Sequence, residues 1–598
     1  MIQRLKILLL GLATGSAFAM TDPISDQEIL KVPTEQRLTA IMAAAQREGW
    51  ARQVAPLRAA AERAYRRDDL EMADAWFNIY RWASIWSSND NDFIDRWKVA
   101  VQTAQVAHAN MPRTPPGRRL PLGFLLLPEL QFWLLSNQAF SREIFSLITP
   151  VDYLPAVFRI LNELHFDNPA KFKAYTSLAL AIALVYDVPP PPKWPHGQVS
   201  TDVLARKWPN PLDAFTWWTK QDQLGLTYYR LAELGAEELR FVVDAPASFP
   251  ELEWSQQAVE HPLASLGKAY TMVRYDIERV QRNELMWSAA TYTLQDILGS
   301  GGICTDQAYF ASNVGKARGV PTLLFRGQGI NARHAWFGFL DSTGKWQLDV
   351  GRYAEQRFVT GYVIDPQTWR EISDHALKFL ADHFLKEPAY LRSRVHAEFA
   401  SDFLFRGNLV AAGSAALKAV KLEPRNFVAW ETMVSVEKTL GFGTKTREGT
   451  LREAAAALQG YPDLEASYSA RLTESMRARG DHSAADVEQA RITLKNQENR
   501  GDISLGQIRT ALVQSFSTQA LSQQLISYHG LLAGPGKGAG IGFFDQVVVV
   551  FVEHLVQIQE LDEAAKAVEL ARQTLKVEPN TQLARDFDEL SRRVVAAH

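Results

Sequence analysis

A single cysteine, Cys304, is present in the 598 residues of the chain. One thiol cannot form a disulfide within its own chain, so the chain has the opposite of a disulfide framework. On the count alone, Cys304 is either an inert, buried small hydrophobe or a reactive thiol. The residues around Cys304 decide between these two interpretations.

The first 19 residues resemble a secretory signal peptide. Arg4 and Lys6 precede an apolar run at residues 7–13, and residues 17–19 read A-F-A, an A-x-A cleavage site. The run is shorter than the ~20 residues that span a bilayer, and no cysteine of a lipoprotein signal lies near the site. We therefore expect an exported protein, periplasmic or extracellular; an N-terminal core helix is the alternative.

The charge balance excludes a nucleic-acid partner, and the hydropathy excludes a membrane-spanning segment. Lys plus Arg number 64 against 67 Asp plus Glu, a net charge of -3, whereas nucleic-acid binding needs clustered positive charge. The apolar stretches at residues 178–186 and 547–552 are too short to span a bilayer and are predicted to be core segments. We expect neither a nucleic-acid partner nor an integral membrane protein.

Residues 20–268 are predicted to form a mainly helical region. Apolar residues between positions 38 and 45 recur at i, i+3, i+4 and i+7, the stripe of an amphipathic helix. Most of the 16 tryptophans precede residue 300; we interpret them as core-packing aromatics, with a sugar- or peptide-binding platform as the alternative. Residues 240–243, R-F-V-V, are predicted to form a strand.

Residues 371–598 are predicted to be helical and repeat-like. Alanine-rich segments there are closed by a Glu-Pro step with an Asn just after it, at residues 423–426 and 578–580. This resembles tetratricopeptide repeats, whose second helix ends before a proline. Small residues let paired helices approach closely, and the resemblance implies docking of a protein partner on helical hairpins.

The pattern changes in residues 269–370. A glycine-rich stretch at residues 299–302 leads to Cys304, and a helix is predicted at residues 305–318. Three strands are predicted at residues 322–326, 335–340 and 345–350. The glycine-containing turn between the last two predicts an antiparallel hairpin.

Three residues of this region are candidates for a nucleophile, a base and an orienting group. Cys304 would begin a helix, where free N–H groups and the helix dipole lower the pKa of a thiol. Pairing in the hairpin is expected to bring His334 and Asp349 side by side, so that the carboxylate orients the imidazole and the imidazole activates the thiol. Gly302 would let a substrate approach the backbone closely.

The combined motif resembles the core of the transglutaminase-like superfamily, a papain-like cysteine fold. Its parts are G-G-x-C, a helix, A-R-G-V-P, H-A-W and W-x-L-D. The resemblance implies that Cys304 is the nucleophile, His334 the base and Asp349 the third member, with Trp336 and Trp346 beside the last two. The whole chain is thus predicted to be α+β and predominantly helical, with this core between an N-terminal helical region and a C-terminal helical-repeat region.

An oxyanion would be stabilised by the Cys304 backbone N–H and one upstream side chain. Gln295 is the first candidate because an amide suits this role, and Tyr292 and Trp287 are alternatives. Neither a metal nor another cofactor is expected, since the sequence has no H-E-x-x-H motif and one cysteine excludes a thiolate cluster.

These features predict an exported cysteine enzyme that attacks a carboxamide or peptide bond of a protein or peptide and forms a thioester. Release by water would make it an amidase or protease, and release by a lysine amine a cross-linking transamidase; the sequence leaves this open. The alternative is a non-catalytic envelope scaffold that keeps the core as a packing unit and binds proteins through its helical hairpins.

Overall fold

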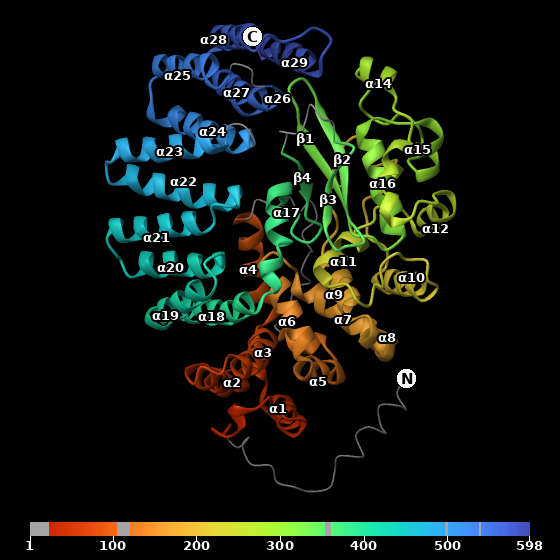
Figure 1. The fold of residues 1–598 in the computed structure, drawn as a ribbon, viewed down its shortest axis with the longest axis vertical. Coiled ribbons are helices and arrows are strands. Elements are labelled where there is room, and N and C mark those ends of the chain that lie inside the picture. Colours follow the sequence, from red (N-terminus) through yellow and green to blue (C-terminus); the bar gives the residue numbers. More distant parts are fainter. Residues whose placement is uncertain (1–22, 104–119, 353–359, 497–499, 537–539, 598) are drawn as a thin grey trace. The chain divides into compact units, whose positions relative to one another are not determined.

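The computed structural model describes residues 23–103, 120–352, 360–496, 500–536 and 540–597. The predicted signal peptide lies outside the described residues. Within these ranges the protein is α+β and predominantly helical, as predicted, with one five-stranded antiparallel sheet (Figure 1). The chain divides into two units, one ending at Val188 and one beginning at Pro189.

The regular elements of the first unit, among its described residues, are helices joined by loops. Its helices are η1 (Glu28–Leu30), α1 (Glu35–Glu48), α2 (Trp50–Arg66), α3 (Leu70–Ser87), α4 (Asp90–Thr103), η2 (Leu122–Leu125), α5 (Pro128–Ser136), α6 (Gln138–Leu147), α7 (Leu154–Asp167), α8 (Pro169–Ala174) and α9 (Thr176–Val185). Trp76, Trp82 and Trp86 of α3 are fully buried, and the Trp82 indole N–H donates to the Ser141 hydroxyl. For these three tryptophans the core-packing prediction is confirmed.

The second unit opens with short helices that lead to the sheet. They are α10 (Pro211–Gln223), α11 (Ala236–Val243), α12 (Phe249–Ala258), η3 (Leu263–Ser265), α13 (Lys268–Met272), α14 (Ile277–Gln281), α15 (Leu294–Ser300) and α16 (Cys304–Ala317). The predicted strand at residues 240–243 is wrong, because these residues end α11. The helix predicted at residues 305–318 is confirmed as α16.

The sheet has the strand order β3-β2-β1-β4-β5. Its strands are β1 (Thr322–Gln328), β2 (Arg333–Leu340), β3 (Trp346–Val350), β4 (Tyr362–Ile364) and β5 (Glu371–Ser373). The three predicted strands are confirmed as β1 to β3, whereas β4 and β5 were not predicted. Helix α16 packs against β1 and β2, so its first residue lies close to the central strands.

Helices from α17 onward complete the second unit. They are α17 (Asp374–Leu380), η5 (His383–Lys386), α18 (Pro388–Phe405), α19 (Leu409–Leu422), α20 (Phe427–Thr439), α21 (Thr444–Ala457), α22 (Pro462–Ala478), α23 (His482–Asn496), α24 (Gly501–Thr518), α25 (Leu521–Ala533), α26 (Ile541–Phe543), η6 (Phe544–Val548), α27 (Val549–Gln557), α28 (Leu561–Thr574) and α29 (Gln582–Ala597). Each helix from α18 to α24 packs against the next one along the chain (Figure 1).

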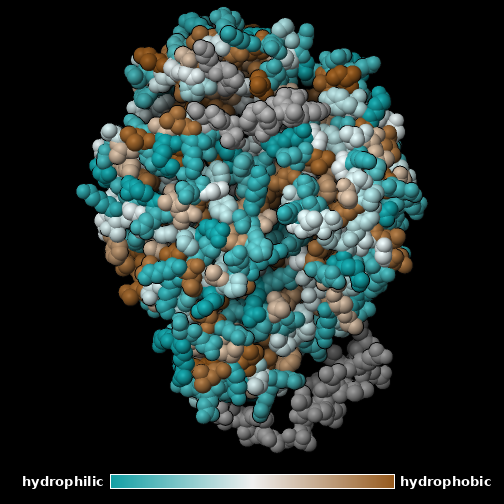
Figure 2. Space-filling model, in the orientation of Figure 1, coloured by the Kyte–Doolittle hydropathy of each residue, from teal (hydrophilic) through white to brown (hydrophobic). Residues whose placement is uncertain are grey.

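We call α18 to α29 the C-terminal helices. One hydrophobic cluster among them includes Trp430 and Tyr468, and a second includes Phe543, Phe551 and Phe587. Among the described residues, none of the helices is both long and apolar enough to cross a bilayer. On the face seen in Figure 2, hydrophobic residues are scattered among hydrophilic ones.

Candidate active site

Two glycines allow the chain to enter α16 directly at Cys304. Gly301 has a φ of 83°, in the left-handed region that favours glycine. The Gly302 N–H donates to the Arg274 carbonyl at 2.9 Å, and the Asp276 N–H donates to the Gly302 carbonyl at 2.9 Å. This short pairing anchors the loop before the helix, and Cys304 follows as the first helical residue.

A buried polar network holds the first turn of α16. The Asp306 carboxylate accepts hydrogen bonds from the Ile303 N–H at 2.9 Å, the Arg279 guanidinium at 2.8 Å and the Tyr292 hydroxyl at 2.9 Å. Because Tyr292 donates to Asp306, His196 Nε2, 3.1 Å from the Tyr292 oxygen, is the donor in that contact. Burial lowers the pKa of His196 to about 3, so this imidazole is neutral.

Replacing Gly302 with alanine is expected to destabilise this turn by about 1 to 3 kcal/mol. A Cβ at Gly302 would lie 2.4 Å from the Asp306 Cβ, so Asp306 would have to move away from its hydrogen-bond donors. Hydrogen exchange of α16 peptides measures the loss of protection. The matched control is Gly299→Ala in α15, where a Cβ meets nothing within 4 Å; equal effects of the two substitutions would contradict the prediction.

The Cys304 sulfur contacts strand β2 beside His334. The Ala335 backbone N–H lies close enough to the sulfur to lower the pKa of the thiol, and Ala335 directly follows His334. Although the residue is partly exposed, burial of the sulfur raises the pKa of the thiol, and the hydrogen bonds from Ala335 and Thr305 offset this only in part. The predicted lowering of the Cys304 pKa is therefore wrong: burial raises it, and the resting thiol is neutral.

The His334 side chain is buried and oriented by a backbone carbonyl. Its Nε2 lies 2.7 Å from the Gly351 carbonyl oxygen. A carbonyl can only accept, so Nε2 carries the proton, and in the neutral ring Nδ1 is then the basic nitrogen. The His334 ring also stacks on Trp336 at 5.9 Å. The structure thus places His334 against Trp336, and Cys304 beside Ala335, the next residue of the same strand, with Gly302 two residues before the helix.

The structure places Asp349 and Trp346 away from His334. Val350, the last residue of β3, pairs with Phe337, three residues beyond His334, and the register shifts between Phe337 and Phe339. Asp349, one residue before Val350, therefore lies beside the middle of β2 and not opposite His334. The Asp349 side chain is 70% exposed and pairs with Arg352 at 2.6 Å. The expected side-by-side placement of His334 and Asp349 is therefore wrong.

Trp346 was expected beside the site, but it pairs with Leu340 at the far end of β2 from His334. Its ring packs edge-on against Phe241, with ring centroids 5.8 Å apart. Trp346 therefore packs against α11 and does not contact the His334 imidazole, which Trp336 does.

Two of the three candidate oxyanion side chains, Tyr292 and Trp287, donate to other groups, and the role of Gln295 stays a prediction. The Gln295 side chain is exposed on α15 and forms no hydrogen bond within the described part of the chain. The Tyr292 hydroxyl donates to Asp306, and the Trp287 indole N–H donates to the Thr291 carbonyl at 2.7 Å. The Cys304 backbone N–H, at the first position of α16, is the remaining donor of the predicted pair.

Two residues that the sequence analysis missed connect the parts of the site. Gly351 has a φ of 87°, and a Cβ there would lie 2.5 Å from the Tyr270 ring. The Tyr270 hydroxyl donates to the Ala335 carbonyl at 2.9 Å. Tyr270 therefore joins the segment that orients His334 to the strand that contacts the sulfur. The glycine just after W-Q-L-D-V was a signal for a turn, but Tyr270 had none.

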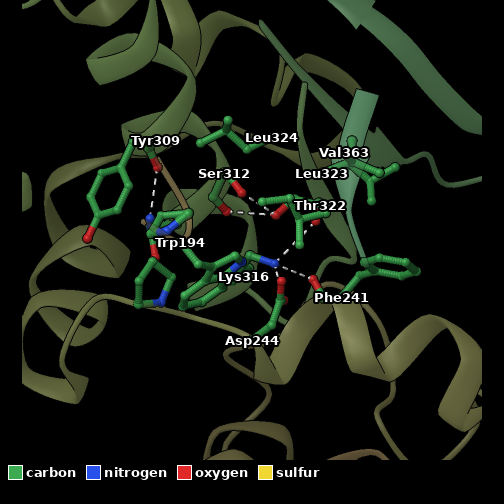
Figure 3. A pocket seen from close by; sticks show the side chains of 14 residues that line it. Trp194, Phe241, Asp244, Tyr309, Ser312, Lys316, Thr322, Leu323, Leu324 and Val363 are labelled. Carbon is green, nitrogen blue, oxygen red and sulfur yellow. Dashed lines mark hydrogen bonds and ion pairs between the residues drawn. The ribbon is translucent and has the colours of Figure 1, made fainter. Parts of the chain in front are cut away.

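A cavity of about 30 Å³ lies near the other end of α16 (Figure 3). There the Lys316 ammonium pairs with Asp244 and donates to the carbonyls of Phe241 and Thr322. Lys316 is twelve residues after Cys304, or about 18 Å along the helix. The cavity has room for about one or two waters and is not a substrate site for the thiol.

Among the described residues, no cluster of three or more His, Cys, Asp or Glu side chains is placed to hold a metal ion. Comparison of the chain with models of known protein families and with curated proteins found no match.

Proposed function

We propose that the protein is a cysteine-dependent acyl-transfer enzyme of the transglutaminase-like type, acting on a carboxamide or peptide bond of a protein or peptide. The observation that carries this proposal is the position of Cys304 at the start of α16, which packs on β2, the strand that holds the buried and oriented His334. A nucleophile at a helix start, with a base on the adjacent strand, is what thioester chemistry needs.

The reaction begins from a neutral thiol. His334 Nδ1 takes the proton of the Cys304 thiol as the sulfur attacks the carbonyl carbon, and the Cys304 N–H stabilises the oxyanion. The C–N bond then breaks, His334 returns the proton to the leaving amine, and a thioester remains. Water or a second amine attacks the thioester, His334 accepts the incoming proton, and the thiol is restored.

Acylation of Cys304 by an activated ester tests this proposal without knowledge of the natural substrate. With p-nitrophenyl acetate at neutral pH, we expect an acetyl group on Cys304 in the intact mass and in the peptide map, and none at this position in Cys304→Ala. Hydroxylamine should remove it, as it removes a thioester. Absence of Cys304 acetylation, with other side chains labelled instead, would contradict the proposal.

A non-catalytic scaffold is the second candidate. It is favoured by the raised pKa of the Cys304 thiol and by the exposure of Asp349. A packing unit needs neither a reactive thiolate nor a carboxylate beside His334. A scaffold would bind a protein partner through the C-terminal helices and would leave Cys304 unreactive toward the ester.

A further inference from the structure

The C-terminal helices hold the turn that precedes His334. We define the hairpin tip as residues 328–333, from the end of β1 to the start of β2. The Ile541 N–H donates to the Ile330 carbonyl at 2.8 Å, and the Leu583 N–H donates to the Asn331 carbonyl at 3.2 Å. A Cβ on Gly540 would lie 2.3 Å from the Ile330 oxygen, so the two backbones are in close contact.

Arg333 makes the most extensive side-chain contacts at this tip. Its guanidinium pairs with Asp545 of η6 at 2.6 Å and with Asp586 of α29 at 2.8 Å. Its backbone N–H donates to the Gln582 side chain at 2.8 Å. Gln328, which pairs with Arg333 in the β1–β2 ladder, also donates to Asp545 at 2.6 Å. Both strands of the hairpin are thus held at their ends.

These contacts act on the residue next to the candidate base. Successive side chains of a strand point to opposite faces, so Arg333 can bind the C-terminal helices while His334 turns the other way. A rotation or slip of the strand at Arg333 would move His334, and would also move Ala335, whose N–H lies near the Cys304 sulfur.

A second set of contacts fixes the C-terminal helices independently of the tip. Arg500 is fully buried and pairs with Asp463 at 2.6 Å and Asp502 at 2.8 Å. Asp502 accepts hydrogen bonds from Thr360 at 2.6 Å and from Tyr362 of β4 at 2.7 Å. A substitution at Arg333 therefore loosens the hairpin tip while the helices stay attached to the sheet.

We infer that Arg333 is a positioning residue through which η6 and α29 set the placement of His334 against Cys304. This inference rests on the proposed function, since it assigns to Arg333 a role in the same site. It means that the C-terminal helices are part of the catalytic apparatus and not only a docking region, so a movement of α29 changes the reactivity of the thiol.

Alkylation of Cys304 by iodoacetamide, followed by intact mass over a range of pH, tests the inference. Cys304 is the only cysteine in the chain, so the mass change reports this site. Arg333→Gln and Asp586→Asn are each expected to lower the His334-dependent alkylation near neutral pH by roughly tenfold, since small misplacements of a catalytic group have large effects. The rise in rate at high pH, which needs only the thiolate, should be unchanged.

The matched control is Arg326→Gln in β1. Arg326 is 40% exposed and pairs with Glu371 of the same sheet, whereas Arg333 is 39% exposed and pairs with the C-terminal helices. The control should keep the pH profile of the unmodified sequence. If Arg333→Gln and Asp586→Asn keep it too, while His334→Ala does not, the inference is overturned and the proposed function stands. If His334→Ala also keeps it, both are overturned.

Discussion

His334→Ala is expected to slow acylation of Cys304 by an activated ester about 100- to 10,000-fold, the range of a general base. The effect is large because the thiol is neutral at rest: burial raises its pKa, so a base must remove the proton as the sulfur attacks. The rate is followed by intact mass at neutral pH. A rate within a few-fold of the unmodified protein would exclude His334 as the base.

Asp349→Asn serves as the control for this prediction. The Asp349 carboxylate is 70% exposed and pairs with Arg352, and the carbonyl that orients His334 belongs to Gly351. We therefore expect a rate close to that of the unmodified protein. A loss as large as that of His334→Ala would restore Asp349 as the third member of a triad and contradict the observed arrangement.

Arg279→Met is expected to destabilise the first turn of α16 by about 3 to 5 kcal/mol, the cost of breaking a buried ion pair on one side. The Arg279 side chain is 8% exposed and its partner Asp306 is 1% exposed. Removal of the guanidinium leaves the Asp306 carboxylate with the Ile303 N–H and the Tyr292 hydroxyl only. Hydrogen exchange of α16 peptides measures the loss of protection.

The pH dependence of the lost stability in Arg279→Met shows whether the unpaired Asp306 carboxylate causes it. Burial already raises the pKa of Asp306, and without Arg279 the pKa rises further. A carboxyl with a raised folded pKa is best tolerated at low pH, where it is neutral, and costs stability as pH rises through that pKa. The deficit of Arg279→Met should therefore shrink as the pH falls. Arg282→Met, which removes exposed ion pairs of the neighbouring arginine, should leave α16 unaffected.

Elements with local signals could be predicted from the sequence, and those without could not. The helix after Cys304 and the strands of the β1–β2–β3 meander follow from apolar runs and glycine-containing turns. Strands β4 and β5 have three residues each, too few to show a period. Residues 240–243 have the composition of a strand, but Glu237 and Glu238 in the first turn and the contacts of α11 make them helical.

In the candidate site, too, some positions follow from local sequence patterns and others depend on the tertiary fold. The positions of Cys304 at a helix start and His334 on an adjacent strand are local properties, and both were predictable. The register of β3 on β2 places Asp349 beside the middle of β2 and not opposite His334, and the sequence alone did not give that register. The pKa of Cys304 depends on how deeply the packed sheet and helix bury the sulfur, which is a tertiary property. Arg279 and Asp306 are 27 residues apart, with no motif that joins them.

The most direct test of the Cys304–His334 pair is the pH profile of Cys304 alkylation in the unmodified protein and in His334→Ala. We expect two components in the unmodified protein: reaction near neutral pH assisted by His334, and a steep rise above the ordinary thiol pKa of about 8.5 as the thiolate forms. His334→Ala should keep only the rise at high pH. Identical profiles of the two proteins would show that the imidazole does not act on the thiol, and would contradict the proposed function.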